Sequence, residues 1–109
     1  MPDYIQVITT AGSREEAEKI SNIVVEKRLG GCVQVLGPMT STYWWQGKIE
    51  RSEEWLCIIK SRADLYDELE AAIRGVHSYE VPEILSVSVI GGSKSYLTWL
   101  ESELRKGAI

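Results

Sequence analysis

A long β-hairpin limits what else this chain can fold into. Residues 31–61 show no helical periodicity, and two β-rich runs flank Gln46-Gly47, where glycine tolerates the positive φ of a tight turn. Each arm would run about fourteen residues, against the ~5–6 of an ordinary strand. Gly37-Pro38 interrupts the first arm and predicts a bulge, because proline cannot donate to a ladder. A two-stranded ribbon is only marginally stable alone in water, so its outer part needs a partner surface.

The segments around the hairpin predict two more strands and three helices. Strands are expected at residues 4–10 and 83–90, and helical spacing of apolar residues predicts helices within 13–30, 61–75 and 93–107. The order β-α-β-β-α-β is typical of the ferredoxin-like α+β fold, an antiparallel four-stranded sheet with helices on one face. We therefore expect one such domain over residues 1–109, with a further C-terminal helix and an uncovered second sheet face.

The expected helix ends rest on polar and glycine residues. Ser13 and Glu16 form a capping box, in which Glu16 reaches back to the start of the first helix. Gly30-Gly31 is expected to supply the C-cap of that helix. Ser61 or Asp64 is expected to cap the second helix, which ends at Gly75. The third helix is expected to start at Ser93 and end at Gly107.

The aromatic residues are concentrated on the hairpin. The chain has no Phe but four Trp and five Tyr, and three of the Trp lie within residues 44–55. Adjacent residues of a strand point to opposite faces, so one core cannot hold both Trp44 and Trp45. Trp and Tyr are enriched at protein interfaces. We therefore predict self-association, with the interface formed by Tyr43, Trp44, Trp45 and Trp55.

Charge and the ends of the sequence exclude several classes of partner. The net charge is −4, with no basic cluster, which argues against nucleic acid and anionic membranes as partners. No apolar run approaches the 18 or more residues of a membrane span, and the first residues lack the features of a signal peptide. The expectation is a cytoplasmic protein whose two cysteines, Cys32 and Cys57, are reduced thiols.

Several motifs together resemble the CutA divalent-cation tolerance family. They cover essentially the whole chain in order and comprise Glu26-Lys27-Arg28-Leu29, Tyr43-Trp44-Trp45-Gln46-Gly47-Lys48-Ile49-Glu50, Glu53-Glu54-Trp55, His77-Ser78-Tyr79-Glu80-Val81-Pro82-Glu83-Ile84 and Tyr96-Leu97-Thr98-Trp99-Leu100. The resemblance implies a very stable cytoplasmic homotrimer with the architecture of the PII nitrogen-signalling proteins. It also implies a role in tolerance of copper or other divalent cations, with no enzymatic reaction attached.

Three residues are candidate metal ligands. His77 is the single histidine and lies in a connector with Glu80, and imidazole with carboxylate suits divalent copper or zinc. Cys32 is the third candidate, although these residues do not fill a metal site within one chain, so ligands from a second subunit or water are needed. Some relatives carry His-His where this chain has Val76-His77, so only weak binding of a divalent cation is expected. The alternative is a histidine that makes structural hydrogen bonds.

A small-molecule pocket between subunits is the alternative function. Its candidate residues are Lys60, which closes the second arm of the hairpin, and Tyr79, Glu83 and Trp99, which belong to the motifs of the family resemblance. Lys60 and Glu83 could instead form a structural ion pair. Catalysis is not expected, because a single histidine without a nucleophile elbow is a poor basis for it.

Overall fold

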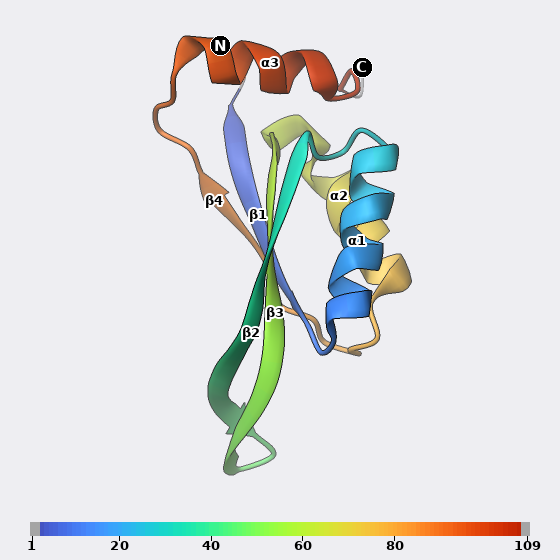
Figure 1. Ribbon diagram of the computed structural model, residues 1–109, viewed down its shortest axis with the longest axis vertical. Helices are drawn as coiled ribbons and strands as arrows, with labels where there is room; N and C mark the ends of the chain where they lie inside the picture. The colour runs from blue at the N-terminus through green and yellow to red at the C-terminus, as the bar shows by residue number, and fades with distance from the viewer. Residues whose placement is uncertain (1–2, 108–109) are drawn as a thin grey trace.

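The computed structural model describes residues 3–107; the expectations for residues 1, 2, 108 and 109 lie outside that range. Within it, four strands form one antiparallel sheet in the order β2-β3-β1-β4 (Figure 1). The elements follow the chain as β1 (Tyr4–Ala11), α1 (Arg14–Glu26), β2 (Cys32–Trp45), β3 (Lys48–Arg62), the 3-10 turn η1 (Ala63–Leu65), α2 (Tyr66–Val76), β4 (Ile84–Ser88) and α3 (Lys94–Glu103). The expected ferredoxin-like α+β fold is confirmed.

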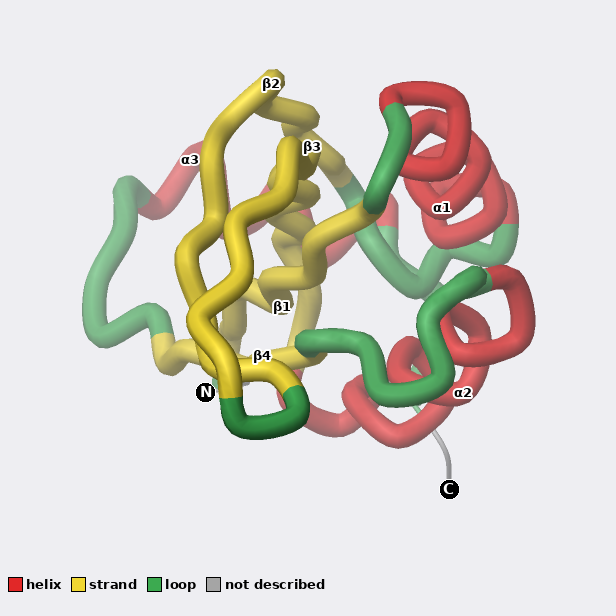
Figure 2. The backbone as a smooth tube through the Cα atoms, turned by 90° about the horizontal axis from the view of Figure 1, so that it is seen from below, coloured by secondary structure: helices red, strands yellow, loops and turns green. Residues whose placement is uncertain are grey.

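The hydrophobic core lies between the sheet and the helices α1 and α2, which cover the same sheet face (Figure 2). Ile5 and Val7 of β1 are buried in this core, whereas Ile8 faces the other side, where it pairs with Leu85. That second face carries exposed apolar residues, including Leu36 and Leu85, so it is uncovered as expected. α3 crosses one end of the sheet (Figure 1). None of the described helices has the length and apolarity needed to span a membrane.

The hairpin extends well beyond the rest of the sheet (Figure 1). β1 pairs with β3 only as far as Ala11 with Trp55, so no third strand from residues 3–107 pairs with the outer part of the hairpin, residues 39–54. The expected bulge is present between Leu36 and Met39. At the tip, Gln46 and Gly47 have φ values of 50° and 79°, the left-handed pair that a tight hairpin turn requires.

The first helix ends differently from the expectation. Its C-cap is Lys27, and the left-handed residue after it is Arg28 with φ of 56°, so the prediction that Gly30-Gly31 caps the helix was wrong. The amide of Leu29 bonds the carbonyl of Val24 at 3.0 Å, as in a Schellman motif. Gly30 serves packing instead, because a Cβ there would lie 2.7 Å from side-chain atoms of both Val24 and Ile59.

The second helix also begins later than expected. Ser61 belongs to β3, and its hydroxyl donates to the carbonyl of Leu29 at 2.6 Å, so it does not cap α2. No side chain of the described residues caps η1 or α2, so Asp64 does not cap α2 either. α2 continues past Gly75 to Val76, β4 is shorter than the expected residues 83–90, and α3 ends before the expected Gly107.

The N-cap of α1 gives a first prediction. Ser13 Oγ accepts a hydrogen bond from the amide of Glu16 at 3.1 Å. Ser13→Ala is expected to lower the free energy of unfolding by about 1 kcal/mol, because the amide loses its partner. Urea denaturation measures it. Ser21→Ala is the matched control, since Ser21 bonds the carbonyl of Ala17 within the helix, and an equal loss in both variants would contradict the prediction.

Candidate functional site

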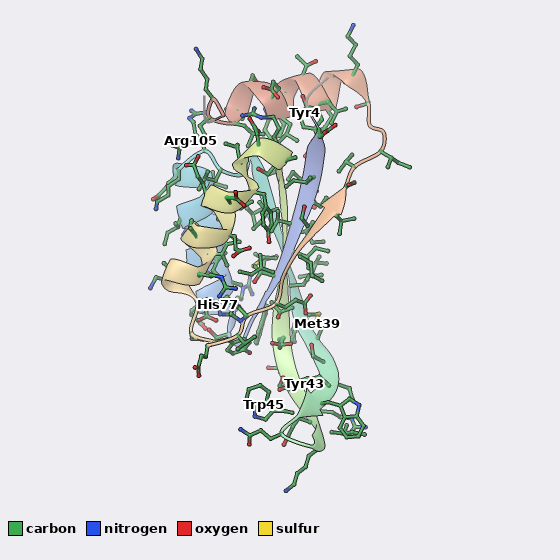
Figure 3. The ribbon with its side chains drawn as sticks, turned by 180° about the vertical axis from the view of Figure 1, so that it is seen from behind. Tyr4, Met39, Tyr43, Trp45, His77 and Arg105 are labelled. Carbon is green, nitrogen blue, oxygen red and sulfur yellow. The ribbon has the colours of Figure 1, made fainter. Side chains whose placement is uncertain are left out.

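A groove of about 680 Å³ lies between the outer hairpin and the connector that follows α2. Figure 3 shows Tyr43 and Trp45 on the projecting hairpin and His77 on the connector. The groove is lined by hydroxyl side chains, three aromatic rings, three carboxylates and Val81: Thr10, Ser41, Thr42, Ser52, Tyr43, Trp45, Tyr79, Glu54, Glu80 and Glu83. No Lys, Arg or His side chain is among these lining residues. The groove is therefore acidic and aromatic.

Hydrogen bonds to the rest of the chain hold the connector in place. His77 Nε2 lies 2.7 Å from the carbonyl oxygen of Thr10, and Nδ1 lies 3.1 Å from the amide nitrogen of Tyr79. A carbonyl only accepts and an amide N–H only donates, so the proton is on Nε2 and Nδ1 is the acceptor. Both ring nitrogens of His77 are thus engaged by the backbone, which matches the structural alternative for this histidine.

Glu16 provides the next contact to the connector. Its carboxylate accepts from the amide of Ser78 at 2.9 Å rather than reaching back to the helix start, so the reciprocal half of the expected capping box is wrong. Burial raises the pKa of Glu16, but the hydrogen bonds from Ser78 outweigh it and hold that pKa below the ordinary value. Glu16 therefore fastens the connector to the start of α1.

Glu54 and Tyr79 meet inside the groove. The hydroxyl of Tyr79 donates to Glu54 Oε2 at 3.0 Å, and Glu54 is only 7% exposed. Burial together with the hydrogen bond and charge of Glu54 raises the pKa of Tyr79 to about 12. Tyr79 thus remains a neutral donor at physiological pH, and no ion pair to Glu54 forms within the described chain.

The four residues expected to form one pocket are separated within a chain. Tyr79 and Glu83 line the groove. Lys60 lies on the uncovered sheet face, where its Nζ donates to Gln34 Oε1 at 2.7 Å. Trp99 lies on α3 with its ring 5.5 Å from that of Tyr96. Lys60 and Glu83 form no ion pair within residues 3–107.

The three candidate metal ligands are also separated. Glu80 lines the groove and His77 bonds Thr10 at the end of β1, but Cys32 lies opposite Lys60, which in turn lies opposite Gln6. Four residues along a strand correspond to roughly 13 Å between the two levels. In the part of the chain that is described, no three His, Cys, Asp or Glu side chains are placed to hold a metal ion.

The predicted interface residues differ in exposure. Tyr43, Trp44 and Trp45 are 42%, 72% and 54% exposed on the outer hairpin. Trp55, in contrast, packs against the hydrophobic core, with its ring over Gly37, where a Cβ would lie 2.4 Å from Trp55 Cδ1. The outer aromatic surface of the single chain therefore consists of Tyr43, Trp44 and Trp45. Sequence reasoning missed Glu54 as a groove residue, because nothing in the sequence shows which of Glu53 and Glu54 is buried.

Comparison with protein families shows which family the chain belongs to. The model of the family described as "CutA1 divalent ion tolerance protein" matches residues 5–103. The chain belongs to the CutA1 family. The resemblance found in the sequence is therefore confirmed over nearly its whole length.

Relatives and solved structures of the CutA1 family agree with this assignment. The chain is 39% identical to the divalent-cation tolerance protein CutA of Pyrococcus horikoshii, over 94% of this chain and 99% of that protein. It is 37% identical to the chloroplastic CutA of Arabidopsis thaliana, over 93% of this chain but 56% of that longer protein. The crystal structure of CutA1 from Oryza sativa superposes with a TM-score of 0.95 at 32% identity, covering 97% of both chains.

Proposed function

We propose that this protein acts in divalent-cation tolerance by binding cations weakly at the acidic groove beside the hairpin. One observation carries the proposal: the groove gathers the carboxylates of Glu54, Glu80 and Glu83 without a basic side chain among its lining residues. Such a groove attracts cations and repels small anions. The relatives are named divalent-cation tolerance proteins, which supports the same proposed function. We place this non-enzymatic function in the cytoplasm.

The donor atoms of the groove decide which cations it suits. Carboxylate and hydroxyl oxygens are ligands for hard divalent ions, whereas copper prefers imidazole and thiolate. Both nitrogens of His77 are engaged by the backbone, and Cys32 lies at a different level of the sheet. Copper therefore fits this single chain poorly, and its binding at His77 would require one backbone hydrogen bond to break. Any preference for copper would need ligands from a second subunit.

We also propose that the working form is a homotrimer. Trp44 and Ile49 on the outer hairpin do not line the groove and are 72% and 54% exposed, and the uncovered sheet face adds further apolar groups. Exposed apolar surface of this extent is typical of an interface between chains. The trimer is the assembly that the family resemblance implies, and it would also bring a second chain close to the groove.

A PII-like sensor of small molecules is the second candidate function. The volume of the groove, about 680 Å³, lies within the roughly 300–1,000 Å³ of small-molecule sites. The rings of Tyr43, Trp45 and Tyr79 favour this reading over one limited to bare ions. Lys60 was expected to line the pocket, but it lies away from this groove, so Lys60→Ala is not expected to change binding there.

Metal titration tests the proposed function. Isothermal titration of Mn²⁺ into the wild-type protein is expected to show weak binding. In the double variant Glu80→Gln with Glu83→Gln, the affinity for Mn²⁺ is expected to fall about tenfold, or about 1.4 kcal/mol. Glu53→Gln is the control, because this exposed glutamate is not a groove residue. A copper titration of His77→Ala follows the same design. Equal affinity of the control and the double variant for Mn²⁺ would contradict the groove as the cation site.

A further inference from the structure

We infer that the groove binds a small organic cation, an ammonium or guanidinium group held by Glu54 and by the rings of Tyr43 and Trp45. This goes beyond the proposed function, because it assigns a different class of ligand to the groove and does not require a metal. Three observations carry it: a buried carboxylate that forms no ion pair within residues 3–107, a hydroxyl that lines the same groove, and aromatic walls.

Glu54 is the anchor of the site. This glutamate is 7% exposed, and its hydrogen bond comes from the neutral hydroxyl of Tyr79. A neutral hydroxyl satisfies one lone pair but leaves the charge uncompensated, and a buried carboxylate is costly unless it is paired. Glu80 and Glu83 add two more negative charges along the same groove. A cation seated beside Glu54 would supply the missing opposite charge.

Thr10 is the second, independent observation. It is 5% exposed, and it lines the groove. Its backbone carbonyl accepts from His77, which leaves the side-chain hydroxyl as the polar group that Thr10 can offer to a molecule in the groove. An N–H of an ammonium or guanidinium group could donate to this hydroxyl oxygen.

Aromatic rings form the outer walls. Tyr43 and Trp45 are two residues apart on β2, so both face the groove, and Figure 3 shows both on the projecting hairpin. Tyr79 faces them from the connector. Organic cations are attracted to the faces of such rings, and Trp attracts them best. The combination of rings with a carboxylate is thus suited to an organic ammonium or guanidinium group.

The dimensions of the groove favour an organic cation over a bare ion. A divalent ion needs several ligands within roughly 2.0–2.6 Å of one point. In the described part of the chain no three His, Cys, Asp or Glu side chains are placed to hold a metal ion, so a divalent ion would bind in the groove only weakly. A groove of about 680 Å³ instead accommodates a molecule of several heavy atoms. A diamine could contact Glu54 with one ammonium group and Glu80 or Glu83 with the other.

The test titrates 1,4-diaminobutane into chelator-treated protein by isothermal calorimetry. We expect saturable binding by the wild type and none with the uncharged analogue 1,4-butanediol. Glu54→Gln is expected to weaken binding at least tenfold, whereas Glu53→Gln, which makes the same change in net charge outside the groove, leaves it unchanged. Tyr43→Leu is expected to weaken binding and Tyr43→Phe to retain it, because phenylalanine keeps the ring.

Several outcomes would overturn the inference. The first is that the assembled wild-type protein does not bind the diamine. The second is that Glu53→Gln and Glu54→Gln lose the same affinity for it, and the third is that Tyr43→Leu and Tyr43→Phe bind it equally. Thr10→Val, which replaces the hydroxyl with a methyl group, is expected to weaken binding and serves if Glu54→Gln does not fold. Because the chelator removes metal ions, failure here is separate from failure of the Mn²⁺ titration.

Discussion

Replacing Trp44 and Ile49 together with serine is expected to separate the assembled protein into single chains of 12.3 kDa. These residues are direct cross-strand partners on the outer hairpin, and they are 72% and 54% exposed in the single chain. Burial of a large apolar side chain contributes about 1.5–3 kcal/mol, and a trimer would lose this contribution in every chain. Sedimentation equilibrium measures the mass, which in the wild type should be three times that of one chain.

The design separates assembly from folding of the subunit. The outer hairpin projects beyond the core, so the double variant should keep the wild-type far-ultraviolet circular dichroism. Val25→Ser is the matched control, because Val25 is an exposed apolar residue of α1, on the helical side of the sheet, and should not change the mass. A wild type that sediments as a single chain, or a double variant that keeps the wild-type mass, would contradict the proposed assembly.

The sequence predicted the fold well where the deciding contacts are local. The order of the elements, the caps at Ser13 and Ser93 and the turn at Gln46-Gly47 all depend on residues a few positions apart. The prediction failed where contacts with a distant segment of the chain determine the local structure. Gly30 is required by contact with Ile59, and Arg28 takes the left-handed position while its guanidinium bonds the carbonyl of Glu103, 75 residues away.

The candidate site shows the same division. Tyr79 and Glu83, which line the groove, were found because they belong to the motifs of the family resemblance. Glu54 was missed because its burial depends on the connector folding back over β3. Cys32 was grouped with His77 on chemical type, yet the register of the sheet sets them at different levels. Residue chemistry was readable from the sequence, whereas residue proximity was not.

Leu100→Ala is expected to destabilise the protein by about 2–5 kcal/mol, because it leaves a cavity under α3. Leu100 is 2% exposed and packs so closely on Gly31 that a Cβ there would lie 2.6 Å from Leu100 Cδ1. Polar contacts also hold this helix, since Glu101 accepts from Arg62 at 2.8 Å and from Tyr4 at 3.1 Å. The substitution leaves these contacts in place, so it isolates the apolar contribution.

Two control variants make the Leu100 prediction specific. Leu100→Met keeps the volume and should cost less than about 1.5 kcal/mol, and exposed Thr98→Ala should stay within about 0.5 kcal/mol. Urea denaturation measures the total loss, and amide hydrogen exchange shows where it occurs. We expect protection of the α3 amides to fall before that of α1, because Arg62 and Tyr4 cannot replace the lost packing. Equal effects of Leu100→Ala and Thr98→Ala would show that α3 is held by its polar contacts alone.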